Sequence, residues 1–139
     1  MDVWVLKPDK LLSIWPFSWL LVLFLLTTHE RQNLAILFIL NIFCVFWAFG
    51  FLRQHCFRHP KFAIQGIRYL NHHFEILYQA EWKPAQMPQQ YYLSNVLMVL
   101  NWRLMDNPKI QLPCVLRLGG TLERDQFSSL KAKLLELEN

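Results

Sequence analysis

The residues best suited to chemistry lie in the stretch 50–62, GFLRQHCFRHPKF, where a long apolar run stops against basic residues. His55, Cys56 and His59 form an H-C-x-x-H arrangement, in which the two histidines would share one face if a helix continued through them. Imidazole and thiolate groups at this spacing are ligands for zinc, and the histidines could also hold haem. The stretch is therefore a candidate metal or haem site.

Two features weigh against that site. A closed zinc site needs four ligands, and no C-x-x-C pair accompanies the stretch, so the others would have to come from His72, His73 or Cys114. Pro60 also disfavours helical geometry at His59. The competing interpretation is a membrane border, in which lipid headgroups hold the basic side chains of Arg53, Arg58 and Lys61. We expect the border, with no metal and no cofactor.

Sequence motifs for enzymatic chemistry are missing as well. The chain has no G-x-S-x-G, no P-loop and no glycine-rich dinucleotide turn, and it contains only four glycines. It has neither a dense basic stripe nor a module for nucleic acid. We expect a protein that is not an enzyme and does not bind nucleic acid.

The elements that position these residues begin with two long apolar runs, 11–28 and 32–52, neither of which carries a formal charge. As helices they would be about 27 and about 31 Å long, enough to cross the hydrocarbon core of a bilayer. The composition of the 139-residue chain, 54% hydrophobic and 17% charged, also indicates a membrane-embedded part. A cleaved signal peptide is disfavoured, because the first run is too long and no small-x-small site follows it. The sequence predicts a transmembrane hairpin over 11–52.

Orientation follows from the basic residues that flank the hairpin. Lys7 and Lys10 precede it and only Arg31 lies in the turn, whereas the segment after it carries Arg53, Arg58, Lys61 and Arg68. We expect both termini in the cytoplasm of a bacterial cell, with residues 1–10 as an N-terminal segment and 53–139 as a cytoplasmic domain. The scattered Cys44, Cys56 and Cys114 predict no structural disulfide in that compartment.

The domain is predicted to be α+β, with an antiparallel sheet of about four strands and a C-terminal helix. Alternation or β-branched composition indicates strands at 61–70, 74–80, 91–105 and 110–118. Residues 91–105 also fit a helical stripe. The Pro- and Gln-rich stretch 81–90 is predicted to be a loop, and Pro113 places the last strand at an edge. Thr121 could cap a helix that packs on the sheet through Phe127, Leu130 and Leu134.

Asn41 lies near the middle of the second apolar run, where an amide without a partner would be costly. Ser18 of the first run is one possible partner, and Asn41 of a second copy is another. The second arrangement would make a homo-oligomer.

The segment LRLGGTLERDQFSSLKAKL, which follows two adjacent apolar runs and a β-rich region, resembles the end of the YgfX family of small bacterial inner-membrane proteins, also called CptA toxin-like proteins. The matching positions are Leu116, Leu118, Thr121, Leu122, Asp125, Phe127, Leu130 and Leu134. Ser128-Ser129 stand where the family usually has two arginines, and Gly119-Gly120 replace its Pro-Asp-like turn.

The resemblance implies a non-enzymatic, toxin-like regulator. Its partners would be a small soluble protein of the flavinylation-factor type and the cytoskeletal or cell-division proteins FtsZ and MreB. We therefore expect a membrane-anchored interaction protein that binds its partner through an exposed sheet edge or the 81–92 loop. The alternative is a haem- or metal-binding accessory subunit of a respiratory membrane complex, whose ligands would include His55 and His59.

Overall fold

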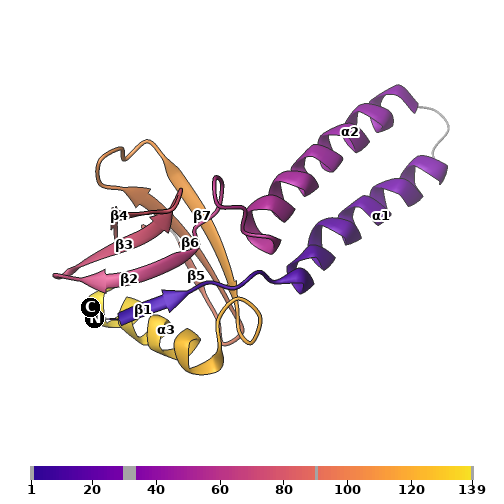
Figure 1. The fold of residues 1–139 in the computed structure, drawn as a ribbon. Coiled ribbons are helices and arrows are strands. Elements are labelled where there is room, and N and C mark those ends of the chain that lie inside the picture. The colour runs from indigo at the N-terminus through magenta and orange to yellow at the C-terminus, as the bar shows by residue number, and fades with distance from the viewer. Residues whose placement is uncertain (1, 30–33, 90, 139) are drawn as a thin grey trace.

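The computed structural model of this chain, shown in Figure 1, describes residues 2–29, 34–89 and 91–138. It consists of two long apolar helices near the N-terminus, a curled antiparallel sheet, and a C-terminal helix. Arg31, which was counted in the turn of the hairpin, and Gln32, the expected start of its second half, lie outside the described residues.

The two helices stand side by side and project away from the sheet (Figure 1). A 3-10 turn, Lys10–Ser13, leads into α1, Ile14–His29; α2, Leu34–Phe51, ends in a π-helical turn, Leu52–Cys56. Each helix buries a single residue among those described, Pro16 in α1 and Ala48 in α2. Most apolar side chains of both helices are therefore exposed.

Within the described residues the sheet has seven strands, not about four. These are β1 (Asp2–Val5), β2 (Gly66–Leu70), β3 (His73–Tyr78), β4 (Glu81–Gln86), β5 (Tyr91–Leu93), β6 (Leu97–Leu104) and β7 (Gln111–Arg117). All pairings are antiparallel, in the order β1-β2-β3-β4-β6. β4 and β5 pair with successive parts of β6, and β7 also pairs with β6. Among the described residues, β1, β5 and β7 each pair with one strand, so these three are edge strands.

The additional strands come from segments that the sequence analysis placed in loops or tails. β1 lies inside the expected N-terminal segment 1–10, and β4 lies inside the expected loop 81–90. Pro84 fits in β4 because its backbone groups face β6 and not β3. Its carbonyl accepts from Met105 N, just beyond the last β4–β6 pair, so the missing N–H removes no hydrogen bond to β3.

The expected strand 91–105 is two strands. Ser94 separates β5 from β6, since its hydroxyl accepts hydrogen bonds from Val96 N at 3.3 Å and Leu97 N at 2.9 Å. The strand interpretation of this segment is confirmed and the helical one is wrong. A tight turn at Asn71-His72, with φ of 48° and 64°, joins β2 to β3.

The core lies on the concave face of the sheet, where α3, Arg124–Glu138, covers it (Figure 1). Phe127, Leu130 and Leu134 are 2%, 0% and 0% exposed and pack with Trp102 and its neighbours in one cluster. The helix begins at Arg124, so Thr121 does not cap it. Thr121 is fully buried, and its hydroxyl accepts from Arg117 N at 3.2 Å.

Candidate interaction site

Strand β1 leaves one of its edges unpaired. Leu6 N donates to Gln65 O on the β2 side. Because backbone hydrogen-bonding groups alternate between the two sides of a strand, the N–H and C=O groups of Asp2 and Trp4 also face β2. The N–H and C=O groups of Val3 and Val5 therefore point the other way. Among the described residues nothing bonds to them, and the next residue on that side, Lys7, donates its N–H to Thr121 O at 2.9 Å. This edge is free to accept another strand.

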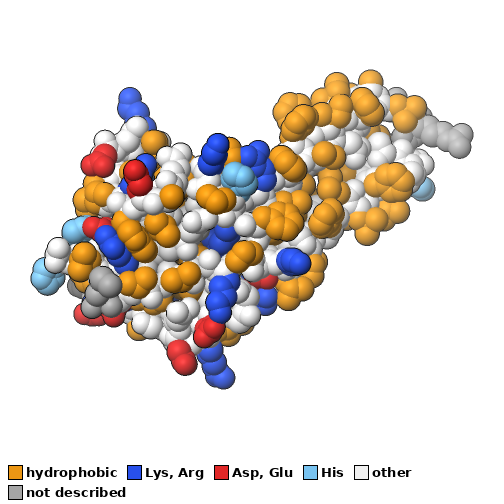
Figure 2. Space-filling view, viewed as in Figure 1, with side chains coloured by type: hydrophobic (Ala, Val, Ile, Leu, Met, Phe, Trp, Pro, Cys, Tyr) orange, Lys and Arg blue, Asp and Glu red, His pale blue; other side chains and the backbone are white. Residues whose placement is uncertain are grey.

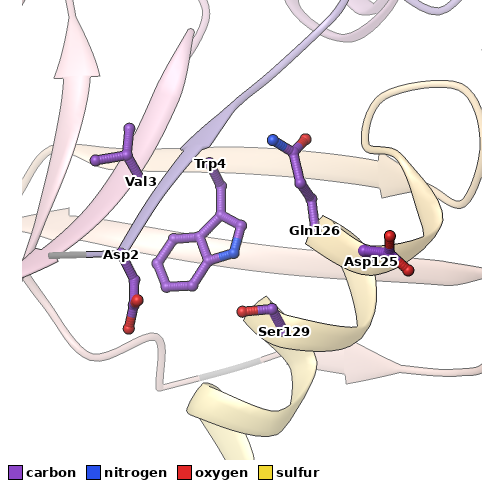
Figure 3. A pocket seen from close by; sticks show the side chains of 6 residues that line it. All are labelled: Asp2, Val3, Trp4, Asp125, Gln126 and Ser129. Atoms are coloured by element: carbon purple, nitrogen blue, oxygen red, sulfur yellow. The ribbon is translucent and has the colours of Figure 1, made fainter.

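A groove of about 370 Å³ runs beside the free edge, between β1 and the first half of α3 (Figure 3). Trp4, which is 2% exposed, points from β1 toward the helix. The remaining lining comes from both elements: Asp2, Val3, Asp125, Gln126 and Ser129. The residues that line the groove thus include two with carboxylates, one with an amide and one with a hydroxyl. Such a groove suits an extended peptide that carries Lys or Arg.

The opposite edge, β7, is already occupied. Leu118 N donates to Val96 O on the β6 side. By the same alternation, the backbone groups of Pro113, Val115 and Arg117 face away from β6. Pro113 has no N–H to offer there, which confirms its expected edge position. Val115 O accepts from Arg58 Nη2 at 2.7 Å, and Pro113 O accepts from Gln54 Nε2 at 3.5 Å. The segment after α2 thus covers this edge with side chains.

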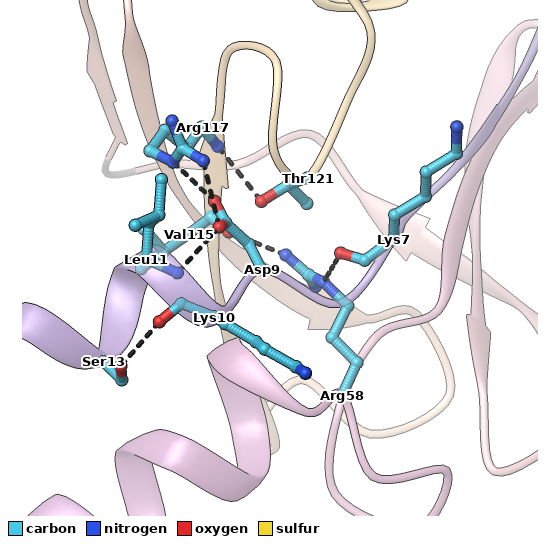
Figure 4. A network of polar contacts seen from close by, with 9 residues as sticks. All are labelled: Lys7, Asp9, Lys10, Leu11, Ser13, Arg58, Val115, Arg117 and Thr121. Atoms are coloured by element: carbon cyan, nitrogen blue, oxygen red, sulfur yellow. Dashed lines mark hydrogen bonds and ion pairs between the residues drawn. The ribbon is translucent and has the colours of Figure 1, made fainter.

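An ion pair ties the hairpin to the sheet (Figure 4). Asp9, which is 4% exposed, accepts from Arg117 Nε at 2.6 Å and Nη2 at 3.0 Å, and from Leu11 N at 3.1 Å. Gly120 leaves the room for it, because a Cβ there would collide with the Asp9 carboxylate and the Arg117 guanidinium. The start of the first helix is thereby fixed against β7.

Arg58 makes the matching connection for the second helix. Only 4% of it is exposed, and its guanidinium donates to Lys7 O at 3.2 Å, Ile64 O at 3.1 Å and Val115 O. Arg58 was expected to contact lipid headgroups. In the structure its guanidinium donates to carbonyl groups of the domain instead. Arg53 lies 4.0 Å from the ring centroid of Phe62, and Lys61 is exposed.

The candidate metal ligands differ in their burial. His55 and Cys56 are buried in the π-helical turn, whereas His59 is exposed and its Nδ1 accepts from Lys61 N at 3.4 Å. Within the part of the chain that the structure describes, no three His, Cys, Asp or Glu side chains form a group that could hold a metal ion. His73 lies on β3, where it contacts Glu75 at 3.2 Å.

Polar side chains inside the hairpin bond within one copy of the chain. Asn41 Nδ2 donates to Leu37 O at 2.8 Å and approaches Thr27 Oγ1 of the other helix at 3.4 Å. Ser18, the expected partner, instead donates to Trp15 O at 2.7 Å. Asn41 thus has partners without a second copy.

Sequence reasoning missed the residues that build the groove and the ion pair. The run of β-branched and aromatic residues Val3, Trp4 and Val5 was the available signal for β1, but the strand has only four residues. Nothing in the sequence relates Asp9 to Arg117, which lies 108 residues away.

Comparison with known proteins adds no assignment: no family model, no curated protein and no solved structure matches this chain.

Proposed function

We propose that this chain is a membrane-anchored, non-enzymatic interaction protein that binds an extended segment of a partner at the free edge of β1. The observation that carries the proposal is this unpaired edge, which faces a groove with two carboxylates (Figure 3). Strand addition supplies affinity through main-chain hydrogen bonds, and Asp2 and Asp125 favour a segment with basic residues.

Membrane anchoring is supported by the surface of the hairpin. The two apolar segments, Lys10–His29 and Leu34–Cys56, have 20 and 23 residues, so as helices they measure about 30 and about 35 Å. Hydrophobic side chains cover the hairpin, whereas charged side chains gather on the domain (Figure 2). A helix pair in the core of a soluble protein would bury most of this surface.

The pairing of β1 with β2 supports a hairpin over a cleaved signal sequence. β1 precedes the first helix and β2 follows the second, so both ends of the hairpin lie at the same domain. Cleavage after α1 would remove Trp4 and Leu6 from the core and Asp9 from its ion pair. We propose that this domain faces the cytoplasm of a bacterial inner membrane, because Lys7, Lys10, Arg53 and Lys61 surround the ends of the hairpin.

The resemblance to the YgfX family supplies the proposed partners. They are a small soluble protein of the flavinylation-factor type and cytoskeletal or cell-division proteins of the FtsZ and MreB kinds, on which the chain would act as a toxin-like regulator. The cytoplasmic domain makes both accessible.

The test is co-purification of the tagged full chain from solubilised membranes, followed by identification of the proteins recovered. Asp2→Lys reverses a charge in the groove, and Asp106→Lys makes the same change at an exposed position in the turn before β7. We expect several-fold lower recovery of the partner with Asp2→Lys and unchanged recovery with Asp106→Lys.

A photocrosslinking amino acid locates the contact directly. Placed at Gln126 in the groove it should capture the partner, and placed at the exposed Glu136 near the other end of α3 it should not. Equal recovery with Asp2→Lys and the unchanged chain, or capture from Glu136 alone, would remove the groove from the proposal.

A further inference from the structure

A second groove, larger than the first, lies where the hairpin joins the sheet. Its volume is about 590 Å³. On one side it is lined by the start of the first helix, including Leu11, Ile14 and Trp15, and on the other by Leu97, Val99 and Val115 of β6 and β7. Ligand sites in proteins typically have volumes of about 300–1,000 Å³ and mainly apolar walls. This groove has the size and lining of such a site.

The strand residues in the groove break the usual pattern of the sheet. Residues of β6 and β7 alternate between the buried core face and the outer face. On the outer face, the half near the hairpin carries Leu97, Val99 and Val115, whereas the far half carries Asn101 and Gln111, joined by a hydrogen bond of 3.2 Å. The outer face of an antiparallel sheet that meets water commonly carries polar residues. The apolar half faces the start of the hairpin across the groove.

A polar side chain also borders this apolar surface. Arg117 lines the groove, and Asp9 accepts from its Nε and Nη2. Among the described residues nothing accepts from its Nη1. Since Asp9 already balances the charge, the remaining donor suits a neutral acceptor such as an ester carbonyl better than a second anion.

We propose that this groove binds one phospholipid of the surrounding bilayer. An acyl chain lies between Trp15 and the outer faces of Leu97 and Val99, and a glycerol ester carbonyl accepts from Arg117 Nη1. The inference rests on the proposed insertion of the hairpin, whose exposed apolar surface continues into the groove through Leu11 and Ile14, which are 57% and 63% exposed. Insertion would place lipid at the mouth of the groove.

The test counts lipids on the full chain by native mass spectrometry after reconstitution with phosphatidylethanolamine and gentle return to detergent. Val99→Asp places a charge in the groove, and Val96→Asp makes the same change three residues earlier, at a side chain that is 60% exposed and outside the groove. We expect one retained phospholipid on the unchanged chain and on Val96→Asp, and at least a tenfold lower bound fraction on Val99→Asp. The near-ultraviolet circular dichroism of all three should match, which shows that they fold.

Photocrosslinking distinguishes the possible occupants. A benzophenone side chain at Leu97 should yield a phospholipid adduct, and one at Ile110, beside the far end of β7, should not. Crosslinking of Leu97 to a second copy of the chain, or equal lipid retention by Val99→Asp, would overturn the proposal. Resistance to carbonate extraction reports on the hairpin separately: an inserted chain without bound lipid refutes this groove alone, whereas an extracted chain refutes the anchoring on which it rests.

Discussion

Removing the charge of Asp9 should loosen the hairpin from the domain, because this carboxylate is 4% exposed and bonds twice to Arg117. Asp9→Asn keeps the size of the side chain but loses the charge. Hydrogen bonds to charged groups contribute about 1.5–3 kcal/mol each. Since the Arg117 side chain is 31% exposed, water replaces part of this interaction. We expect a loss of about 2–3 kcal/mol in the free energy of unfolding.

Arg117→Gln should cost more, about 3–5 kcal/mol, because it leaves a carboxylate buried without its cation. The double variant Asp9→Asn/Arg117→Gln removes both charges and should lose at least about 2 kcal/mol less than the sum of the single changes. In a domain of this size, 1 kcal/mol corresponds to about 4–8 °C in melting temperature. Thermal unfolding of the four chains in detergent micelles, followed by near-ultraviolet circular dichroism, measures this coupling. Additivity of the single effects within about 0.5 kcal/mol would refute the ion pair as the connection between hairpin and sheet.

Three further outcomes follow from the packing. Leu130→Ala should lower the free energy of unfolding by about 2–5 kcal/mol, since Leu130 is fully buried under the sheet. Leu137, on the same helix, is 40% exposed, so Leu137→Ala should lower it by under about 1 kcal/mol in the same melting experiment. Equal losses would contradict the core position of Leu130. Ala80→Gly should raise stability by about 0.5–1 kcal/mol, because Ala80 has a φ of 64° that glycine adopts without strain, and a lower melting temperature would count against this reasoning. Burial raises the pKa of the Cys114 thiol, so Cys114 should react with maleimide at pH 8 only after unfolding, and rapid labelling of the folded chain, detected by peptide mass, would show that the core is open.

Periodicity in the sequence was sufficient to predict the elements whose burial is regular. β7 alternates over seven residues, and α3 places Phe127, Leu130 and Leu134 at helical spacing, so each pattern identifies both the element and its buried face. The apolar helices are equally evident, because their length and lack of charge do not depend on any contact.

Long-range contacts explain what the sequence could not predict. β1 is four residues long and acquires its strand partner more than sixty residues later, in β2. In the sequence, Pro84 disfavours a strand at 81–86. It is tolerated in β4 because it lies where the β4–β6 pairing ends. The basic residues after the second helix looked alike in the sequence. Arg58 is nevertheless buried and donates to three carbonyl groups, two of which, Lys7 O and Val115 O, lie more than 50 residues away along the chain. Such partners depend on the tertiary fold rather than on local pattern.

The central claim, a hairpin in the membrane with its domain in the cytoplasm, is tested most directly by reporter fusions to the C-terminus of the full chain in bacterial cells. Pairing of β1 with β2 keeps the N-terminal segment at that same domain. We expect that a fusion to green fluorescent protein is fluorescent and that a fusion to alkaline phosphatase is inactive, and that both are found in the membrane fraction and resist carbonate extraction. An active phosphatase fusion, which requires export, or recovery of the chain in the soluble fraction would contradict it.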